Sequence, residues 1–134
     1  MPDSKARIRR PALIFWFAAG MVLLLLAYGS VCLVIGAGVG EAMTRALDRF
    51  PENGTEALIS VASSAEFPLK ARNRAIWALG QLGDVRALAP LESLKTGKPC
   101  DHAAAVCQHE LRKAIRQCRG GVNITRWAWK PFVL

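Results

Sequence analysis

The sequence contains few of the residues from which catalytic sites are built. Its 134 residues include two histidines and one tyrosine. No Ser-His-Asp set, pair of carboxylates or glycine-rich phosphate loop stands out along the chain. We therefore predict that the protein is not an enzyme, has no catalytic residues and binds no cofactor.

The scarcity of histidine also argues against a metal site. Three cysteines and both histidines crowd one segment, at Cys100, His102, Cys107, His109 and Cys118. In a helix, which turns by about 100° per residue, the cysteines would share one face and the histidines would lie on the opposite side. A tetrahedral site would need ligands from elsewhere, and the chain has no other histidine. We therefore predict no metal ion, and we place the cysteine face in the core.

Charge is absent from residues 11–40. A membrane-spanning helix needs about 20 apolar residues to cross a hydrocarbon core about 30 Å thick. We therefore predict a single transmembrane helix here, which contacts the lipid bilayer. The apolar region of a cleaved signal peptide usually has only about 7 to 15 residues. Cleavage stays open as an alternative, because small residues at 36–42 would tolerate a peptidase.

Basic residues on either side of this segment predict its orientation. The first ten residues carry four of them, Lys5, Arg7, Arg9 and Arg10. Only Arg45 and Arg49 lie in the twenty residues that follow the segment. The positive-inside rule then places the N-terminus in the cytoplasm and the larger C-terminal part in the periplasm or outside the cell.

Two glycines near the end of the apolar segment allow two interpretations. Gly36 and Gly40 form a G-x-x-x-G pair, which would let two transmembrane helices approach closely in a homodimer. We favour the other interpretation, in which these glycines mark the end of the helix.

The pattern of apolar and turn residues divides the chain into five parts. These are a cytoplasmic basic tail (1–10), the transmembrane segment (11–40), a juxtamembrane linker (41–53), a helical module (54–121) and a C-terminal tail containing tryptophan (122–134). Within the module we predict four helices, over residues 55–63, 69–82, 85–95 and 102–118. Asp84 and Asp101 are the expected N-caps of the last two. The second helix has an apolar stripe of Ala71, Ala75, Ala78, Leu79 and Leu82.

Residues 74–94, RAIWALGQLGDVRALAPLESL, carry a family resemblance. They resemble a HEAT-like repeat of the type found in phycobilin lyases and many bacterial scaffold proteins. The resemblance rests on Arg74-Ala75, Ala78-Leu79-Gly80, Leu82-Gly83-Asp84, Ala87-Leu88 and Pro90-Leu91. It implies an all-α fold, an α-solenoid whose relatives mostly bind proteins, and it brings no catalytic residues with it. A lyase-like enzyme, which only the resemblance implies, is the least favoured function. The chain has room for about two repeats, where three or more are usual. A disulfide, the tail, the membrane or a partner must therefore add support.

Cysteine spacing limits the disulfide that an oxidising compartment would allow. Cys107 and Cys118 in one helix would be separated by about 16 Å, too far for a bridge. Cys100 follows Pro99 and can curl back, so we favour a Cys100–Cys107 bridge.

The tail and the basic residues before it are the remaining unusual features. Arg126, Ala128 and Lys130 alternate with Trp127 and Trp129, which predicts an extended segment. We expect this tail to fold back as a cap, with Trp127 or Trp129 packed on the module and the basic residues in solvent.

These features predict a membrane-anchored scaffold or adaptor in the cell envelope, bound to a protein that the sequence does not name. The candidate partner-binding residues are Trp77, which lies opposite the apolar stripe of its helix, and the basic residues Arg112, Arg116 and Arg119. The favoured alternative for Trp77 is packing under the tail or against a neighbouring helix, and for the basic residues it is a solvated helix face. The net charge is +8, and no acidic residue follows Glu110. The alternative function is therefore binding of polyanions or lipid head groups, whereas nucleic acid is the less expected partner.

Overall fold

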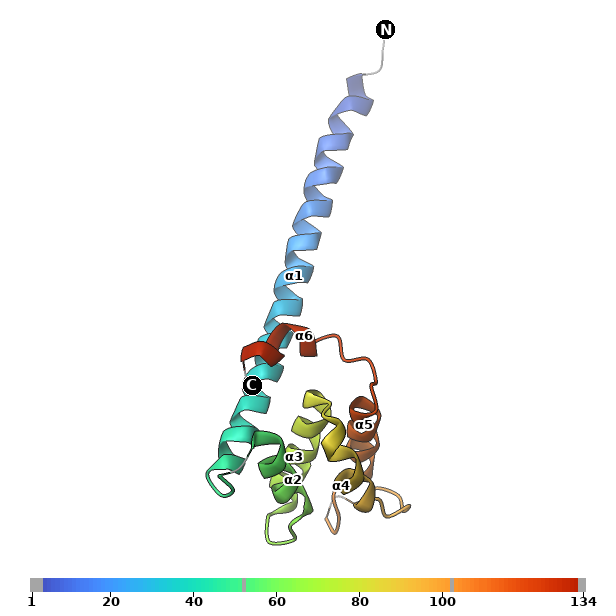
Figure 1. Cartoon of the computed structure of the whole chain (residues 1–134). Helices are drawn as coiled ribbons and strands as arrows, with labels where there is room; N and C mark the ends of the chain where they lie inside the picture. Colours follow the sequence, from blue (N-terminus) through green and yellow to red (C-terminus); the bar gives the residue numbers. More distant parts are fainter. Residues whose placement is uncertain (1–3, 52, 102, 133–134) are drawn as a thin grey trace.

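The computed structural model describes residues 4–51, 53–101 and 103–132, and over these residues it is all-helical (Figure 1). The helices are α1 (Ser4–Leu47), α2 (Gly54–Ser63), α3 (Leu69–Leu82), α4 (Leu88–Ser93), α5 (Gln108–Cys118) and α6 (Arg126–Trp129). A 3₁₀ turn, η1 (Val85–Ala87), leads into α4, and another, η2 (Lys130–Phe132), follows α6. The predicted fold is confirmed: one long apolar helix precedes several short helices that pack together.

Helix α1 is long and apolar enough to span a membrane over Ala12–Leu47. It projects far beyond the remaining helices, which gather around its C-terminal end (Figure 1). Between residues 12 and 34 its large apolar side chains are exposed on all sides, as Phe17 (73%) and Leu33 (75%) illustrate. Such a continuous apolar surface is unfavourable in water and suits the interior of a bilayer.

The last turns of α1 belong to the core of the module. Val39, Met43 and Ala46 are buried together with residues of α2 and α3. Their spacing of three and four residues forms a helical stripe, which the module covers. Residues 41–47, the first part of the predicted juxtamembrane linker, continue α1 as expected, but they pack on the module and do not extend into water. Gly36 and Gly40 do not mark a helix end. The anchor and the module therefore share one core.

Helix α3 is the centre of the module and contacts both α2 and α5. Of its predicted apolar stripe, Ala71 is half-buried and the other four residues are buried, Leu79 completely. Gly80 lets α5 approach closely, because a Cβ atom there would lie 2.8 Å from the Ala114 Cα atom. Gly83 ends the helix with φ of +60°, a conformation that glycine adopts without strain.

Asp84 caps the following turn, as predicted, and also joins two helices. Its carboxylate accepts hydrogen bonds from the Arg86 backbone N–H (3.0 Å) and from the Thr55 hydroxyl in α2 (3.2 Å). The neighbouring Arg86 guanidinium lowers the pKa of Asp84 to about 2. The start of α2 is thereby tied to the turn between α3 and α4.

Helix α5 begins at Gln108, later than predicted. Asp101 does initiate a turn, in which its carboxylate accepts from the Ala103 and Ala104 N–H groups. The backbone then becomes extended at Cys107, whose N–H donates to the Asn73 side chain of α3 (2.8 Å). This tertiary hydrogen bond replaces a helical one, so the turn does not continue into α5. His102, which we had placed opposite the cysteines, lies outside the described residues.

The tail forms helical turns, α6 and η2, where the sequence predicted an extended segment. The Asn123 side chain accepts from the Thr125 N–H (3.2 Å) and so starts the turn. Trp129 is buried, as we expected of one tail tryptophan, but it packs on Gly36 of α1, in the predicted transmembrane segment, whereas we expected it to pack on the module. The tail lies across α1 (Figure 1). Arg126 does not point to solvent, because it donates to the carbonyls of Gln81 and Gln117.

Candidate interaction groove

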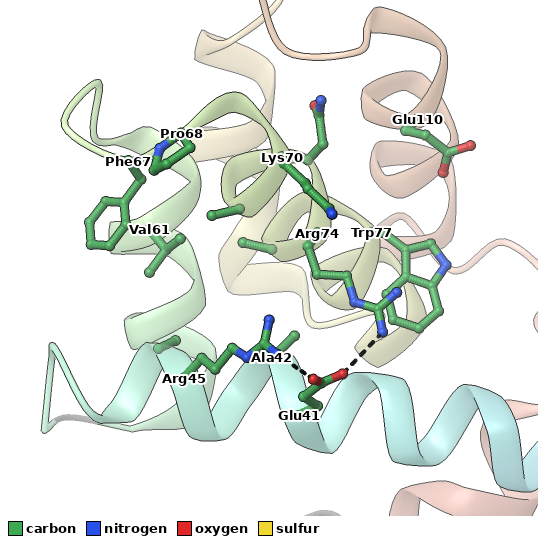
Figure 2. A pocket seen from close by; sticks show the side chains of 14 residues that line it. Glu41, Ala42, Arg45, Val61, Phe67, Pro68, Lys70, Arg74, Trp77 and Glu110 are labelled. Carbon is green, nitrogen blue, oxygen red and sulfur yellow. Dashed lines mark hydrogen bonds and ion pairs between the residues drawn. The ribbon is translucent and has the colours of Figure 1, made fainter.

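A groove of about 760 Å³ lies where α1, α2 and α3 meet (Figure 2). We call it the α1–α3 groove. Its lining comprises Glu41, Ala42, Arg45, Ala46, Val61, Phe67, Pro68, Lys70, Ala71, Asn73, Arg74, Ala75, Trp77 and, from α5, Glu110. The groove thus combines residues that are more than thirty positions apart in the sequence.

Small side chains create the space. Ala42 and Ala46 on α1 face the groove from one side, and Ala71 and Ala75 on α3 face it from the other. Because alanine side chains end at Cβ, they leave the gap between the two helices partly unfilled. Phe67 lies toward one end of the groove (Figure 2), and its ring centroid is 6.0 Å from that of Phe50. The floor is consequently apolar and shallow.

Charged side chains surround this apolar floor. Glu41 is the centre of a small ion-pair network, with a carboxylate oxygen 2.5 Å from an Arg45 nitrogen and another 3.7 Å from an Arg74 nitrogen (Figure 2). Lys70 and Glu110 also line the groove, and neither forms an ion pair with any of the described residues. Three basic and two acidic side chains leave the rim with a net charge of +1.

Trp77, predicted to bind a partner, lies at the groove and is half-buried. The Arg74 guanidinium carbon is 4.5 Å from its ring centroid, within the range of a cation–π interaction. The same guanidinium donates to the Gly38 carbonyl of α1 (3.4 Å). A Cβ atom on Gly38 would lie 3.1 Å from the Trp77 ring, so glycine allows this ring to pack on α1. Trp77 therefore holds α3 against the anchor and also forms part of the groove wall.

The predicted basic residues lie away from this groove. Arg112 and Arg116 are exposed on α5, and neither lines the groove. Arg119 is exposed too, but it forms an ion pair with Glu92. The structure therefore does not bring the three arginines together with Trp77 in one site.

The four cysteines are free, and only Cys100 is exposed. The Cys100 sulfur accepts a hydrogen bond from the His109 N–H (3.2 Å), at the start of α5. Cys107 and Cys118 are buried as expected, and burial raises the pKa of Cys118 to about 11. The placement of Cys100 on the same core face was wrong, because α5 begins only at Gln108 and Cys100 lies outside it. The Cys100–Cys107 bridge stays a prediction. Over residues 4–51, 53–101 and 103–132, no three Cys, His, Asp or Glu side chains gather closely enough to hold a metal ion.

Among the groove residues, sequence reasoning named only Trp77 as partner-binding and missed the charged residues on both α1 and α3. Lys70 and Arg74 are four positions apart, and Trp77 follows three later, so all three share one face of α3. That pattern is visible in the sequence. Glu41 and Arg45 show the same four-residue spacing, but they fell in the segment that we assigned to a linker.

Comparison with known proteins supports the repeat. A family model described as PBS lyase HEAT-like repeat matches residues 71–96, which cover nearly all of α3, the Gly83–Asp84 turn and α4. The predicted resemblance is therefore confirmed over this stretch, and the chain carries a HEAT-like repeat. No curated protein and no solved structure matched the chain.

Proposed function

We propose that this protein is a non-catalytic adaptor or scaffold of the cell envelope, whose α1–α3 groove binds a segment of a protein partner. The single observation that carries this proposal is the groove itself. It has an apolar floor, a charged rim and a half-buried tryptophan, which are typical features of a protein-binding site. Its lining includes no histidine, cysteine or serine that would suggest catalysis.

The groove is held close to the membrane because α1 forms one of its walls. Glu41 follows the last lipid-facing residue that we identify on α1, Val34, by seven positions, or about 10 Å along the helix axis. A partner in the groove would therefore lie beside the bilayer. The basic N-terminus supports an orientation in which this side is the periplasm or the cell exterior.

The chemistry of the groove indicates what kind of segment it binds. Alanine-lined floors accept a helix or extended chain that contributes larger apolar side chains. The basic excess of Arg45, Lys70 and Arg74 favours acidic residues beside that apolar face. We therefore expect an amphipathic segment with an apolar stripe and acidic flanks, in a protein attached to the same membrane.

The test compares two matched charge reversals. Arg74→Glu changes the rim of the groove, whereas Arg112→Glu makes the same change on the exposed face of α5. Full-length variants would be solubilised in detergent from the native membranes, and the proteins that they retain would be quantified. Arg74→Glu is expected to lower retention about tenfold or more, which corresponds to losing about 1.4 kcal/mol of binding free energy. Arg112→Glu should retain the partner. Lys70→Glu repeats the test at a second rim position.

The opposite pattern would contradict the proposal. If Arg112→Glu abolishes binding while Arg74→Glu and Lys70→Glu leave it intact, the basic face of α5 is the binding surface. Steep weakening with ionic strength would then indicate a polyanion or lipid head groups, because release of counterions makes such binding salt-dependent.

A further inference from the structure

Three apolar side chains of the tail point away from the protein. Val122 is 89% exposed, Ile124 66% and Trp127 88%. We call these three residues the tail ridge. In a water-soluble tail of this kind, the apolar side chains would be expected to face inward.

The polar side chains of the same segment face the protein. The Asn123 amide donates to the Gln81 side chain (2.8 Å), and the Thr125 hydroxyl donates to Asn123 (2.8 Å). The Arg126 guanidinium donates to backbone carbonyls of α3 and α5. The segment is thus amphipathic in the reverse sense, with polar groups bound to the module and the apolar ridge outside. A reversed arrangement is stable where the surroundings are apolar.

Contacts with α1 fix the level of the ridge along the anchor. The Tyr28 hydroxyl donates to the Ile124 carbonyl (2.6 Å), and Trp129 packs on Gly36. Cys32, between these two positions and on the same face, is buried. If hydrocarbon begins near Ala12, about 20 helical residues bring its far boundary close to Val31. The tail therefore crosses α1 where the helix leaves the hydrocarbon.

We propose that the tail ridge inserts into the bilayer leaflet from which α1 emerges, at the boundary between phospholipid head groups and acyl chains. Tryptophan is enriched at this depth because its ring is apolar while its N–H stays near water. The exposed apolar surface of α1 is continuous with the ridge through Tyr28 and Ile124, so one lipid phase would cover both. The absence of acidic residues after Glu110 removes repulsion from lipid phosphate.

This second attachment restricts the module as well as the tail. A single spanning helix leaves the module free to tilt in any direction relative to the bilayer. Insertion of the ridge on one side of α1 restricts this tilt, because tilting toward the opposite side would pull the ridge out of the leaflet. The proposal does not depend on what the α1–α3 groove binds.

The test places an environment-sensitive fluorophore on the ridge. Trp127→Cys, combined with Cys100→Ser, would be labelled with the NBD fluorophore and reconstituted in phosphatidylcholine–phosphatidylglycerol vesicles. The control is the protein with its native cysteines, labelled at exposed Cys100. Cys100 lies in the segment between α4 and α5, which is at the far end of the helical module from α6 (Figure 1). We expect blue-shifted emission at position 127 and strong quenching by lipids that carry a nitroxide on the acyl chain. Position 100 should show neither effect.

Two outcomes would overturn the proposal. Emission at position 127 as red as at position 100 would mean that the ridge faces water. Blue-shifted emission without quenching by the nitroxide lipids would mean that a second copy of the chain covers the ridge. Val122→Cys provides an independent site, and protease resistance of each variant would verify that the module is folded.

Discussion

Replacing Leu79 by aspartate should unfold the helical module. Leu79 is completely buried on α3, the helix that contacts both α2 and α5. An unpaired charge in such a core typically costs about 3 to 5 kcal/mol. A small domain has total stability of only about 5 to 15 kcal/mol, and this module is near the lower limit of size. The arginines of α3, Arg72 and Arg74, are trypsin sites that folding protects, so rapid cleavage there would report the unfolding.

Val85→Asp is the matched control for this prediction. Val85 lies in η1, in the same repeat, and is 67% exposed. The same charge at this position stays in water and should leave protease resistance nearly unchanged. If Leu79→Asp were as resistant as the unmodified protein, the apolar stripe of α3 would not face a core.

Replacing Trp129 by alanine should detach the tail from α1. Trp129 is 3% exposed and packs on Gly36, and loss of a buried tryptophan ring typically costs about 3 to 5 kcal/mol. Because the tail is the outermost element, it opens before the module unfolds. A loss of about 3 kcal/mol raises the open population on the order of 100-fold. Tryptic cleavage after Arg126 would accelerate in proportion, since this residue is then released from its carbonyl partners.

Trp129→Phe separates packing from hydrogen bonding. Among the described residues, no acceptor lies within reach of the buried Trp129 Nε1 atom. Phenylalanine keeps most of the buried apolar area and removes no hydrogen bond within the chain. The tail of the Trp129→Phe variant should therefore stay closed. Equal cleavage rates in the unmodified protein and in Trp129→Ala would show that the ring does not hold the tail.

Local patterns predicted the central repeat well. The apolar stripe of α3, the left-handed Gly83 and the Asp84 cap depend on residues within a few positions of one another. Other features depend on tertiary contacts that periodicity does not reveal. Helix α5 starts late because the Asn73 side chain in α3 takes the Cys107 N–H. The alternation around Trp127 and Trp129 suggested an extended segment. Instead, the Asn123 side chain accepts from the Thr125 N–H, Arg126 donates to the Gln81 carbonyl, and the segment forms a helical turn.

The groove also depends on tertiary contacts that the sequence pattern does not reveal. On its α3 side the sequence indicated only Trp77, whose position opposite the apolar stripe made it a candidate partner-binding residue. Its α1 side was missed because Glu41 is the first charge after a long apolar run. This charge suggested that the helix enters water here and packs against nothing. In the structure the apolar spacing of Val39, Met43 and Ala46 continues past this charge, and the module packs on it. Only the fold shows that these turns face α3.

We expect α1 to cross the bilayer and to hold the module on the far side, and labelling of native Cys100 tests this arrangement directly. Cys100 is the exposed cysteine, and the other three are buried. Intact cells would be treated with a membrane-impermeant reductant, which opens any Cys100–Cys107 bridge, and then with a membrane-impermeant maleimide. We predict labelling of the unmodified protein in intact cells and its loss in Cys100→Ser. Labelling that appears only after the membrane is permeabilised would place the module in the cytoplasm and contradict the account.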